Sequence, residues 1–573
     1  MIILLLGRLG QIQLFQAESF TEKNINLIKN SVAQRAQEIV IDDGRGQIID
    51  RNGDPLTYSE KAVLVLFPFL KNIEWDAQKV ANILNIPVTS LYRAVESETK
   101  PFAYGKKDPY LLTEKQLQKI NELHIPGVIG IKRKEVEKDI PGAQLMGIVA
   151  ENKEMFLNRY PRHRGNANQK IGISGLQHTF DEFLLGEEES KLIYHVDGIG
   201  NQLFGLNVKY TGENNQFYPL NIKSTIDKEL QQKVEKILDK HQLEKGGVVL
   251  LDVEKSEILV MASRPQINKD DPYKDNGIEN LMMKQHIPGS IFKTVVAAAA
   301  IEHRLVDDKK LFHCDENIYG KPDQRKLGKL NFEASFAQSC NRTFGDLAKH
   351  LKQIDKNILD DYAEKLALIG LSGWRGNVYH YSNFKQLSEE KGRIFLHEEN
   401  RKDDNYTAQT GIGQHEVRVT PLAATNMMAT IARGGKKYMV NAVSEIEYKN
   451  GTTMTTFPKK RLEGEIISNY TVKKLQYMLK EVVQNNDGTG SYLKNLPYDV
   501  AGKTGTAETG KFTNNQQHYN KWFTGYFPTE SPKYALTVVS LDVLEEEGSV
   551  LPLFSDIVHL LSTYDEQANN STS

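Results

Sequence analysis

Two β-rich stretches at opposite ends of the C-terminal half constrain the fold of this chain more than any other feature. The first stretch, GGVVLLDVEKSEILVMAS at residues 246–263, has two apolar runs around a polar turn and predicts a hairpin in a buried sheet. The second stretch comprises residues 521–528 and 534–543 and predicts two further strands. Strands at both ends of a segment, with helical patterns between them, indicate one α+β domain whose sheet gathers its first and last strands.

Amphipathic helices are predicted at both borders of this domain. The segment STIDKELQQKVEKILDKHQ begins at Ser224, with Asp227 three residues later as the second member of a capping box. Its apolar residues recur on one helical face; they are Ile226, Leu230, Val234, Ile237 and Leu238. A last amphipathic helix is predicted at residues 555–564, before a polar tail. We therefore expect the C-terminal domain to span residues 219–565 and residues 566–573 to be disordered.

The size and charge of the chain narrow the classes of function. With 573 residues, the chain is long enough for two to four domains. Its 72 basic and 74 acidic residues give a formal charge of −2, which argues against nucleic-acid binding because such proteins usually carry a basic field. Two cysteines, Cys314 and Cys340, are too few for a disulfide framework or a four-cysteine zinc site. We therefore expect burial to stabilise the fold, and we expect no metal site.

A serine and a lysine stand at the start of an apolar helix in the segment QHIPGSIFKTVVAAAAIEH. The Pro-Gly pair marks a helix start, so Ser290 is predicted in the first turn, with Lys293 three residues later on the same face. A serine hydroxyl becomes a good nucleophile when a neighbouring base takes its proton, and an apolar environment lowers the pKa of a lysine amine. The pair therefore predicts an acylation nucleophile beside its general base.

The Ser-x-x-Lys pattern alone is weak, because it also occurs at Ser97, Ser382 and Ser388. Two further motifs distinguish Ser290. The sequence holds one Ser-x-Asn triplet, Ser339 to Asn341, and one Lys-Thr-Gly triplet, Lys503 to Gly505. The set S-x-x-K, S-x-N and K-T-G, in this order, is the motif set of penicillin-binding proteins and class A β-lactamases.

The sequence resembles the class B penicillin-binding proteins, monofunctional peptidoglycan D,D-transpeptidases of the penicillin-interactive serine acyltransferase superfamily. Residues 45–56 are similar to the family's opening turn, and residues 172–186 resemble the segment that closes its N-terminal pedestal. Residues 411–435 resemble its Gly-Gln stretch and the following helix. The resemblance covers residues 45–561. It implies a serine transpeptidase/β-lactamase-like domain, with an antiparallel sheet and a helical cluster, on an elongated pedestal of the class B dimerisation type at residues 21–218.

The resemblance also implies catalytic roles. Ser290 would be the acylated nucleophile and Lys293 its general base. Ser339 would relay a proton to the leaving group, and Asn341 would hold Lys293 and the substrate amide. Lys503 would attract the substrate carboxylate and help to keep Lys293 neutral.

Substrate binding is implied for the strand after Lys503. Thr504 and Thr506 would line the edge strand, and Gly505 would let the substrate backbone lie close. The backbone N–H groups of Thr506 and Ser290 would form the oxyanion hole. Cys340 stands where the motif often has aspartate, and we interpret it as a small buried residue, not a second nucleophile.

The implied function is a peptidoglycan D,D-transpeptidase that cross-links stem peptides through a Ser290 acyl-enzyme and is acylated by β-lactams. One alternative is a D,D-carboxypeptidase or β-lactamase-type hydrolase, in which water resolves the acyl-enzyme. Another is a non-catalytic β-lactam sensor or scaffold. No cofactor is expected. The implied partners are stem peptides, β-lactams, and a glycan polymerase with other cell-wall proteins bound through the N-terminal domain.

Residues 1–20, MIILLLGRLGQIQLFQAESF, leave two interpretations open. The apolar run meets Arg8 too soon for a complete membrane span and lacks the basic region that begins a signal peptide. It is predicted either as a short amphipathic helix packed on the protein or as the outer part of a membrane anchor that is incomplete in this sequence. The resemblance favours the anchor, and with it a single-pass protein on the extracytoplasmic face of a bacterial membrane.

Overall fold

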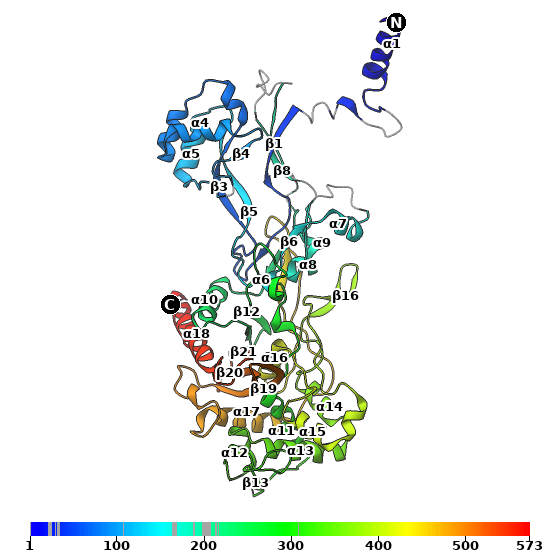
Figure 1. Ribbon diagram of the computed structural model, residues 1–573, viewed down its shortest axis with the longest axis vertical. Helices are drawn as coiled ribbons and strands as arrows, with labels where there is room; N and C mark the ends of the chain where they lie inside the picture. Colours follow the sequence, from blue (N-terminus) through cyan, green and yellow to red (C-terminus); the bar gives the residue numbers. More distant parts are fainter. Residues whose placement is uncertain are drawn as a thin grey trace.

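The computed structural model describes residues 2–572, except 21–25, 29, 31–34, 107, 163–168, 187–188, 198–207, 213–214, 216 and 308. The elements follow one another along a long axis (Figure 1). The N-terminal helix lies at one end of this axis, and the helical cluster of the C-terminal domain lies at the other. The chain is therefore an elongated molecule in which the N-terminal half stands on the C-terminal domain.

The N-terminal half contains two small sheets. One has the strand order β4-β3-β5 and packs three helices against one face through a buried apolar cluster. The other has the order β1-β8-β9 and packs against the opposite side of β3. The elements are β1 (Ala36–Asp42), β3 (Tyr58–Leu66), α3 (Ala77–Leu84), α4 (Val88–Glu96), β4 (Phe102–Ala103), α5 (Glu114–Glu122), β5 (Val128–Val136), β8 (Ser190–His195) and β9 (Lys209–Thr211).

A middle segment joins this half to the C-terminal domain. Its elements are α6 (Ala143–Met146), β6 (Val149–Glu151), α7 (Lys153–Arg159), β7 (Lys170–Gly172), α8 (Gly175–Thr179) and α9 (Asp181–Leu184). Arg45 and Asp181 form a buried ion pair of 2.7 Å here, and Arg45 also donates to the Gln177 side chain. This pair ties the opening turn of residues 45–56 to residues 172–186, so two distant stretches of sequence form one structural unit.

The C-terminal domain is built on an antiparallel sheet with the order β12-β11-β21-β20-β19. Its strands are β11 (Gly246–Asp252), β12 (Glu257–Arg264), β19 (Ala501–Thr513), β20 (Gln516–Phe527) and β21 (Tyr534–Val543). The first hairpin pairs directly with the last strand, with Val248 opposite Val538. The prediction that one sheet gathers the first and last strands is confirmed, and with it the α+β class.

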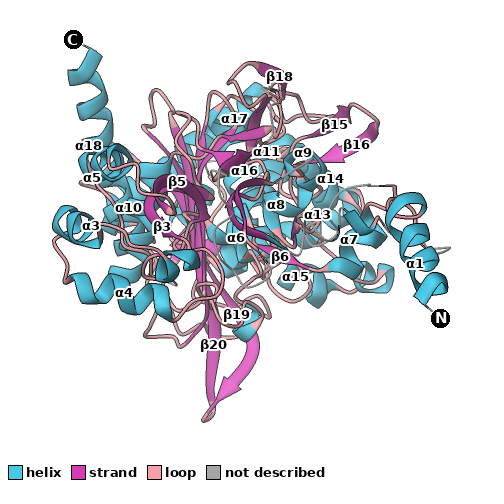
Figure 2. Cartoon of the chain, turned by 90° about the horizontal axis from the view of Figure 1, so that it is seen from above, coloured by secondary structure: helices cyan, strands magenta, loops and turns pink. Residues whose placement is uncertain are grey.

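Helices cover both faces of this sheet (Figure 2). One face packs against α10 (Lys228–Lys240) and α18 (Leu551–Thr572). The other packs against α16 (Pro421–Ala432), behind which lies a cluster around α11 (Lys293–Glu302). The rest of this cluster is α12 (Phe332–Ala337), α13 (Asn341–Ile354), α14 (Ile358–Lys365), α15 (Asp404–Gly411) and α17 (Asn469–Gln484). Residues 293–301 of α11 are all buried, as expected for a helix that is apolar on every side.

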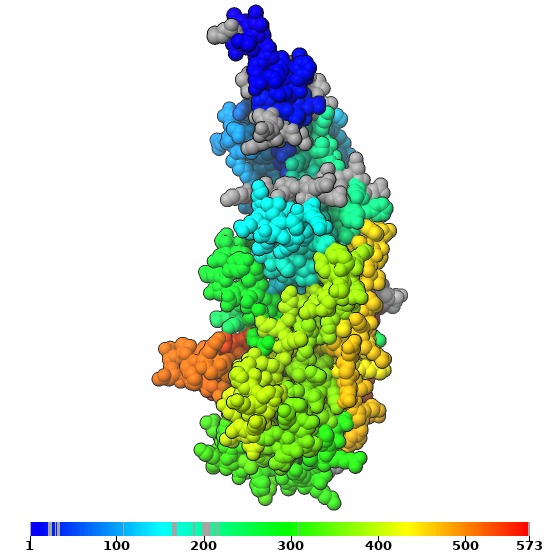
Figure 3. Space-filling view, turned by 90° about the vertical axis from the view of Figure 1, so that its right-hand side faces the viewer, coloured from blue at the N-terminus to red at the C-terminus, as the bar shows by residue number. Residues whose placement is uncertain are grey.

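One small four-stranded sheet and two pairs of short strands lie outside the main sheet in the described part of the C-terminal half. A sheet of order β18-β17-β10-β2 connects the opening turn to the C-terminal domain, because β2 runs parallel to β10. The remaining strands are β2 (Ile48–Ile49), β10 (Asn221–Ser224), β13 (Phe312–His313), β14 (Lys329–Leu330), β15 (Arg375–Val378), β16 (Tyr381–Lys385), β17 (Val443–Glu447) and β18 (Thr453–Thr456). The hairpin of β19 and β20 stands out from the side of the domain (Figures 2 and 3).

Both helices at the borders of the domain differ from the prediction. Helix α10 begins at Lys228 and is capped by Asp227, whose carboxylate accepts from the Leu230 N–H. Ser224 does not cap it, because that residue is extended in β10 and pairs with β17. Helix α18 continues to Thr572, so the prediction of a disordered tail is wrong for residues 566–572. Asp565 anchors the last turns by accepting from the hydroxyls of Tyr498 and Tyr534.

The N-terminal helix α1 (Ile2–Gly10) has no buried residue and points away from the rest of the molecule (Figure 1). The interpretation as a helix packed on the protein is therefore wrong. Among the described helices, none combines the length and the apolarity that crossing a membrane requires.

Candidate active site

The predicted nucleophile lies where a tight turn meets the edge of the main sheet. Ser290 is half-buried in the 3-10 turn η5 (Gly289–Phe292), which leads directly into α11. Gly289 has a φ of 58°, and a Cβ atom there would lie 2.3 Å from the Thr506 carbonyl oxygen. Only glycine fits this position, because the backbone is left-handed and β19 is in direct contact. The turn thereby holds Ser290 against the strand of the Lys-Thr-Gly motif.

The amine of Lys293 connects the first two motifs. It donates to the Ser339 carbonyl at 2.9 Å, to the Ser339 hydroxyl at 3.1 Å and to Asn341 Oδ1 at 2.7 Å. Burial, then the charge of Lys503 and then that of Arg325 hold the pKa of Lys293 well below its usual value. A low pKa gives the neutral amine that a general base requires.

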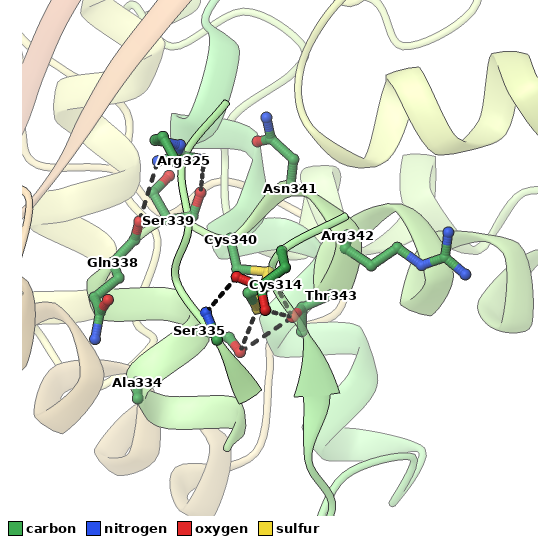
Figure 4. The surroundings of a disulfide bond; sticks show 12 residues. Cys314, Arg325, Ala334, Ser335, Gln338, Ser339, Cys340, Asn341, Arg342 and Thr343 are labelled. Carbon is green, nitrogen blue, oxygen red and sulfur yellow. Dashed lines mark hydrogen bonds between the residues drawn. A yellow bond between two sulfur atoms is a disulfide. The ribbon is translucent and has the colours of Figure 1, made fainter. Parts of the chain in front are cut away.

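The Ser-x-Asn motif is held by a disulfide bond. Ser339 has a φ of 57° and lies between α12 and α13, and Asn341 is the first residue of α13. Cys340, between them, is bonded to Cys314, which follows β13 (Figure 4). Thr343 and Ser335 surround the bond with hydroxyl groups.

This disulfide corrects the expectation that burial alone stabilises the fold. Two cysteines cannot form a framework, but they form one link, with Cα atoms 5.7 Å apart across 26 positions of sequence. Their distance in space could not be read from the sequence, because it depends on how the loop between β13 and β14 folds back. Cys340 is buried, as we predicted.

Lys503 supplies a second buried amine. It lies in β19, donates to the Thr504 carbonyl at 3.3 Å and sits 5.7 Å from the centre of the Phe336 ring. Burial, and then the charge of Arg325, lower the pKa of Lys503 to about 7. A substrate carboxylate at this site would favour the protonated amine, since an opposite charge stabilises the charged form.

Arg325 is a site residue that sequence reasoning missed. From the loop between β13 and β14, its guanidinium donates to the Ser339 carbonyl at 3.0 Å and to the Gln338 carbonyl at 3.3 Å. It lines the same cleft as Ser290. The surrounding sequence KPDQRKLGK is an ordinary polar loop with no motif spacing, so no signal in it could have identified the residue.

The edge strand β19 forms the remaining wall of the site. Thr504 shares a 2.7 Å hydrogen bond with Thr489, and the Gln414 amide lies 3.5 Å from the Thr506 carbonyl oxygen. A Cβ atom on Gly505 would lie 2.4 Å from the Pro288 carbonyl oxygen. Glycine is therefore required at 505 by the turn that carries Ser290, a reason that differs from the substrate contact we predicted.

These residues enclose one cleft of about 390 Å³. It is lined by Ser290, Arg325, Ser339, Asn341, Ile412, Gln414, Thr489, Thr504, Thr506, Glu508 and Tyr519. The amines of Lys293 and Lys503 lie buried beside it. Three segments far apart in sequence thus bring together a hydroxyl, a low-pKa amine and the outer strand of the main sheet. Such an arrangement is suited to nucleophilic acyl transfer.

Comparisons with known proteins give two matching families. Residues 246–559 match the family described as the penicillin binding protein transpeptidase domain, and residues 40–217 match the penicillin-binding protein dimerisation domain. Stage V sporulation protein D of Bacillus subtilis is 27% identical over 563 residues, covering 93% of this chain and 78% of that protein. Peptidoglycan D,D-transpeptidase FtsI of Escherichia coli K12 is 23% identical over 575 residues, covering 94% of this chain and 84% of that protein.

A solved structure supports the fold. It comes from work entitled "Structural coordination of polymerization and crosslinking by a peptidoglycan synthase complex". The match has a TM-score of 0.67 at 20% identity and covers 98% of this chain and 95% of the other. At this identity, the likeness concerns the architecture alone.

Proposed function

This chain belongs to the class B penicillin-binding proteins, and from that premise we propose that Ser290 is the residue through which this peptidoglycan D,D-transpeptidase forms its acyl-enzyme. The observation that carries the proposal is the Lys293 amine. It is buried, has a lowered pKa and is hydrogen-bonded to both polar residues of the Ser-x-Asn motif. A charged, solvated lysine could not accept the serine proton.

In the proposed reaction, the Ser290 hydroxyl attacks the carbonyl of the penultimate D-Ala of a stem peptide, and Lys293 takes its proton. The backbone N–H groups of Ser290 and Thr506 stabilise the oxyanion. Ser339 passes a proton to the amine of the departing D-Ala, whose carboxylate is bound by Lys503 and Thr504. An amine of a second stem peptide then attacks the acyl-enzyme, which forms the cross-link and restores the serine.

The elements that carry the cleft residues, among them β19 and α13, lie in the part of the molecule far from α1 (Figure 1). We propose that residues 21–218 form the pedestal and residues 219–565 the transpeptidase unit. We place α1 at the membrane surface, because Ile2, Ile3 and Leu4 are largely exposed and apolar. The Cys314–Cys340 disulfide supports an extracytoplasmic location, since such bonds persist in oxidising environments.

We also propose a glycan polymerase as the partner of the N-terminal half. The support is the likeness in fold to a chain from a peptidoglycan synthase complex. The sheets of the N-terminal half lie between α1 and the C-terminal domain (Figure 1), where a membrane-bound partner would meet the chain.

A fluorescent penicillin tests the function on the wild type and on Ser290→Ala. A transpeptidase keeps the label for hours, and the variant takes up none. Loss of the label within minutes would contradict the transpeptidase and indicate a β-lactamase-type hydrolase. A wild type that takes up no label would favour a non-catalytic scaffold.

A further inference from the structure

One acidic side chain of the cleft has no role in the chemistry described above. Glu508 is exposed on β19, two residues beyond Thr506, and lines the cleft together with Tyr519, its partner across the strand pair. The two residues stand opposite each other in the register of β19 and β20, and burial, then the charges of Glu545 and Glu508, raise the pKa of Tyr519. Among the described residues, none forms an ion pair with Glu508.

A lysine nearby does not neutralise this carboxylate. Lys521 pairs with Thr506 across the strands and is therefore a diagonal neighbour of Glu508. Its amine, however, donates to the backbone carbonyls of Glu545 and Glu547 in the loop after β21. Glu508 therefore presents an uncompensated negative charge to the cleft.

The charges of the cleft are separated along β19. Arg325 and Lys503 lie at the end that holds the Ser-x-Asn and Lys-Thr-Gly motifs. Glu508 lies five positions beyond Lys503 on a strand that rises about 3.3 Å per residue. The cleft is thus cationic at one end and anionic at the other.

The proposed function, on which this inference rests, fixes how a donor peptide lies along this gradient. Its terminal carboxylate is held near Lys503, and its scissile carbonyl lies between the N–H groups of Ser290 and Thr506. β19 is the outer strand of the sheet, so an extended peptide can add beside it. The donor residues before the scissile bond then run toward Glu508, roughly 7 Å beyond Thr506 along the strand.

We propose that Glu508 is a specificity residue that binds the side-chain ammonium group of a basic residue in the donor stem peptide. The basic residue precedes the D-Ala that becomes attached to Ser290. The carboxylate supplies the opposite charge, and the neighbouring Tyr519 ring offers an aromatic surface that attracts cations. Glu508 does not touch the reacting atoms, so its effect is on the choice of donor and not on the chemical step.

Two tripeptides test this role. The first is Nα-acetyl-L-lysyl-D-alanyl-D-alanine, with a free side-chain amine, and the second carries an acetyl group on that amine. The measured quantity is kcat/KM for release of D-Ala by the full chain. Because exposed ion pairs contribute little, we expect the wild type to prefer the free amine by about two- to fivefold. The preference should fall to about one in Glu508→Gln, persist in Glu508→Asp and reverse in Glu508→Lys.

The matched control is Glu530→Gln, which removes an exposed carboxylate from the turn at the opposite end of β20 and should keep the wild-type preference. Labelling by a neutral penicillin checks each variant for an intact site. Equal preferences in the wild type and Glu508→Gln, with penicillin labelling retained, would overturn the role of Glu508 and leave the proposed function standing. Failure of the wild type to react with penicillin and with either peptide would overturn both.

Discussion

At the scale of single residues, the cleft brings three basic side chains into a small space. Lys293, Lys503 and Arg325 repel one another, and burial adds to this repulsion for the two lysines. The pKa of the Lys293 amine is held well below its usual value, so this amine can be neutral and serve as the base that we propose. Arg325 contributes to this effect without being part of any sequence motif.

We expect Arg325→Gln to move the pH dependence of acylation to higher pH. In the proposed mechanism, acylation requires neutral Lys293, so its rate should rise as the pH passes the pKa of this amine. Arg325 lowers that pKa, and its removal therefore raises it. The variant also loses the bond to the Ser339 carbonyl. At pH 7, acylation should fall roughly tenfold, the equivalent of about 1.4 kcal/mol.

The second-order rate constant of penicillin acylation, measured between pH 5 and pH 10 by stopped-flow fluorescence, checks this expectation. The control is Lys326→Gln, which removes the neighbouring exposed cation of the same loop. An unchanged pH profile in Arg325→Gln would show that the guanidinium does not tune the base.

Lys503→Met is expected to slow acylation and to leave the fold intact. Methionine fills a similar buried volume without the charge that, in our proposal, attracts the substrate carboxylate. The loss should exceed tenfold and should concern KM more than kcat, because the carboxylate is held in both the ground state and the transition state. Circular dichroism serves as the control for folding. If Lys503→Met acylated as fast as the wild type, Lys503 would have no role in binding the substrate.

The sequence predicted which motif residues would meet, because the order and identity of three short motifs are specific. Ser290, Ser339, Asn341 and Thr504 line one cleft as that prediction requires. Arg325 and Glu508 could not be found in this way. Their importance depends on how a loop and an edge strand lie in space, and no local pattern encodes that arrangement.

At the scale of elements, the disulfide is the feature with the largest expected contribution to stability. It closes a loop across 26 positions and fixes the turn between α12 and α13. The chain-entropy model gives about 3.5 kcal/mol for a loop of this length. The double variant Cys314→Ser, Cys340→Ser should unfold at lower temperature and should also acylate more slowly, because Ser339 and Asn341 flank the lost link.

Differential scanning calorimetry and penicillin labelling measure these two effects. Wild-type protein kept in reductant is the matched control and should behave like the double variant. Identical melting of the double variant and the oxidised wild type would show that the bond does not stabilise the domain.

The start of α10 offers a second test at this scale. Asp227 caps the helix and also accepts a 2.6 Å hydrogen bond from the Tyr564 hydroxyl of α18. Asp227→Ala should therefore cost roughly 1 to 2 kcal/mol. Ser224→Ala is the matched control and should have little effect, since the buried Ser224 hydroxyl has no hydrogen-bond partner among the described residues. Chemical denaturation measures the free energy of unfolding of both variants, and an equal loss of stability in the two would contradict the assignment of Asp227 as the cap.

Four strands of the main sheet, β11, β12, β20 and β21, could be predicted because their apolar runs are long and bounded by turns, whereas the polar β19 was implied only by the family resemblance. Their ends were harder to predict. The helix that begins at Lys228 follows a serine, a threonine and an aspartate, each a good cap, and the pairing of β10 with β17 decides among them. Such a choice rests on a contact between residues more than 200 positions apart.

At the scale of the whole molecule, the cleft belongs entirely to the C-terminal half of the chain. Every residue that lines the cleft lies between Ser290 and Tyr519. The middle segment is held together by Asp181. Its carboxylate forms ion pairs with Arg45 and Arg159. It also accepts hydrogen bonds from the Tyr160 hydroxyl and the Gly172 N–H. The two halves should therefore respond separately to mutation.

Asp181→Asn is expected to loosen the middle segment while leaving penicillin labelling intact. Breaking a buried ion pair costs roughly 3 to 5 kcal/mol, because the remaining charges lose their partner. Hydrogen exchange should become faster in residues 143–186 and stay unchanged in α11. Asp139→Asn, which alters an exposed ion pair nearby, is the control. Faster exchange throughout the C-terminal domain, with loss of labelling, would contradict the separation.

The resemblance predicted two units and their order, but the sequence could not show that α1 has no buried residue or that α18 continues to Thr572. Both features depend on which other elements lie nearby. Apolar residues in α1 predict burial equally well against protein or lipid, and polar residues in the last turns of α18 resemble those of a free tail.

The account as a whole depends on the convergence of three distant motifs on one activated hydroxyl. Peptide mapping by mass spectrometry after brief exposure to benzylpenicillin tests it most directly. The account predicts one adduct, on the peptide that contains Ser290, in the wild type and almost none in Lys293→Ala. An adduct on the peptide that contains Ser339, or undiminished acylation of Lys293→Ala, would contradict it.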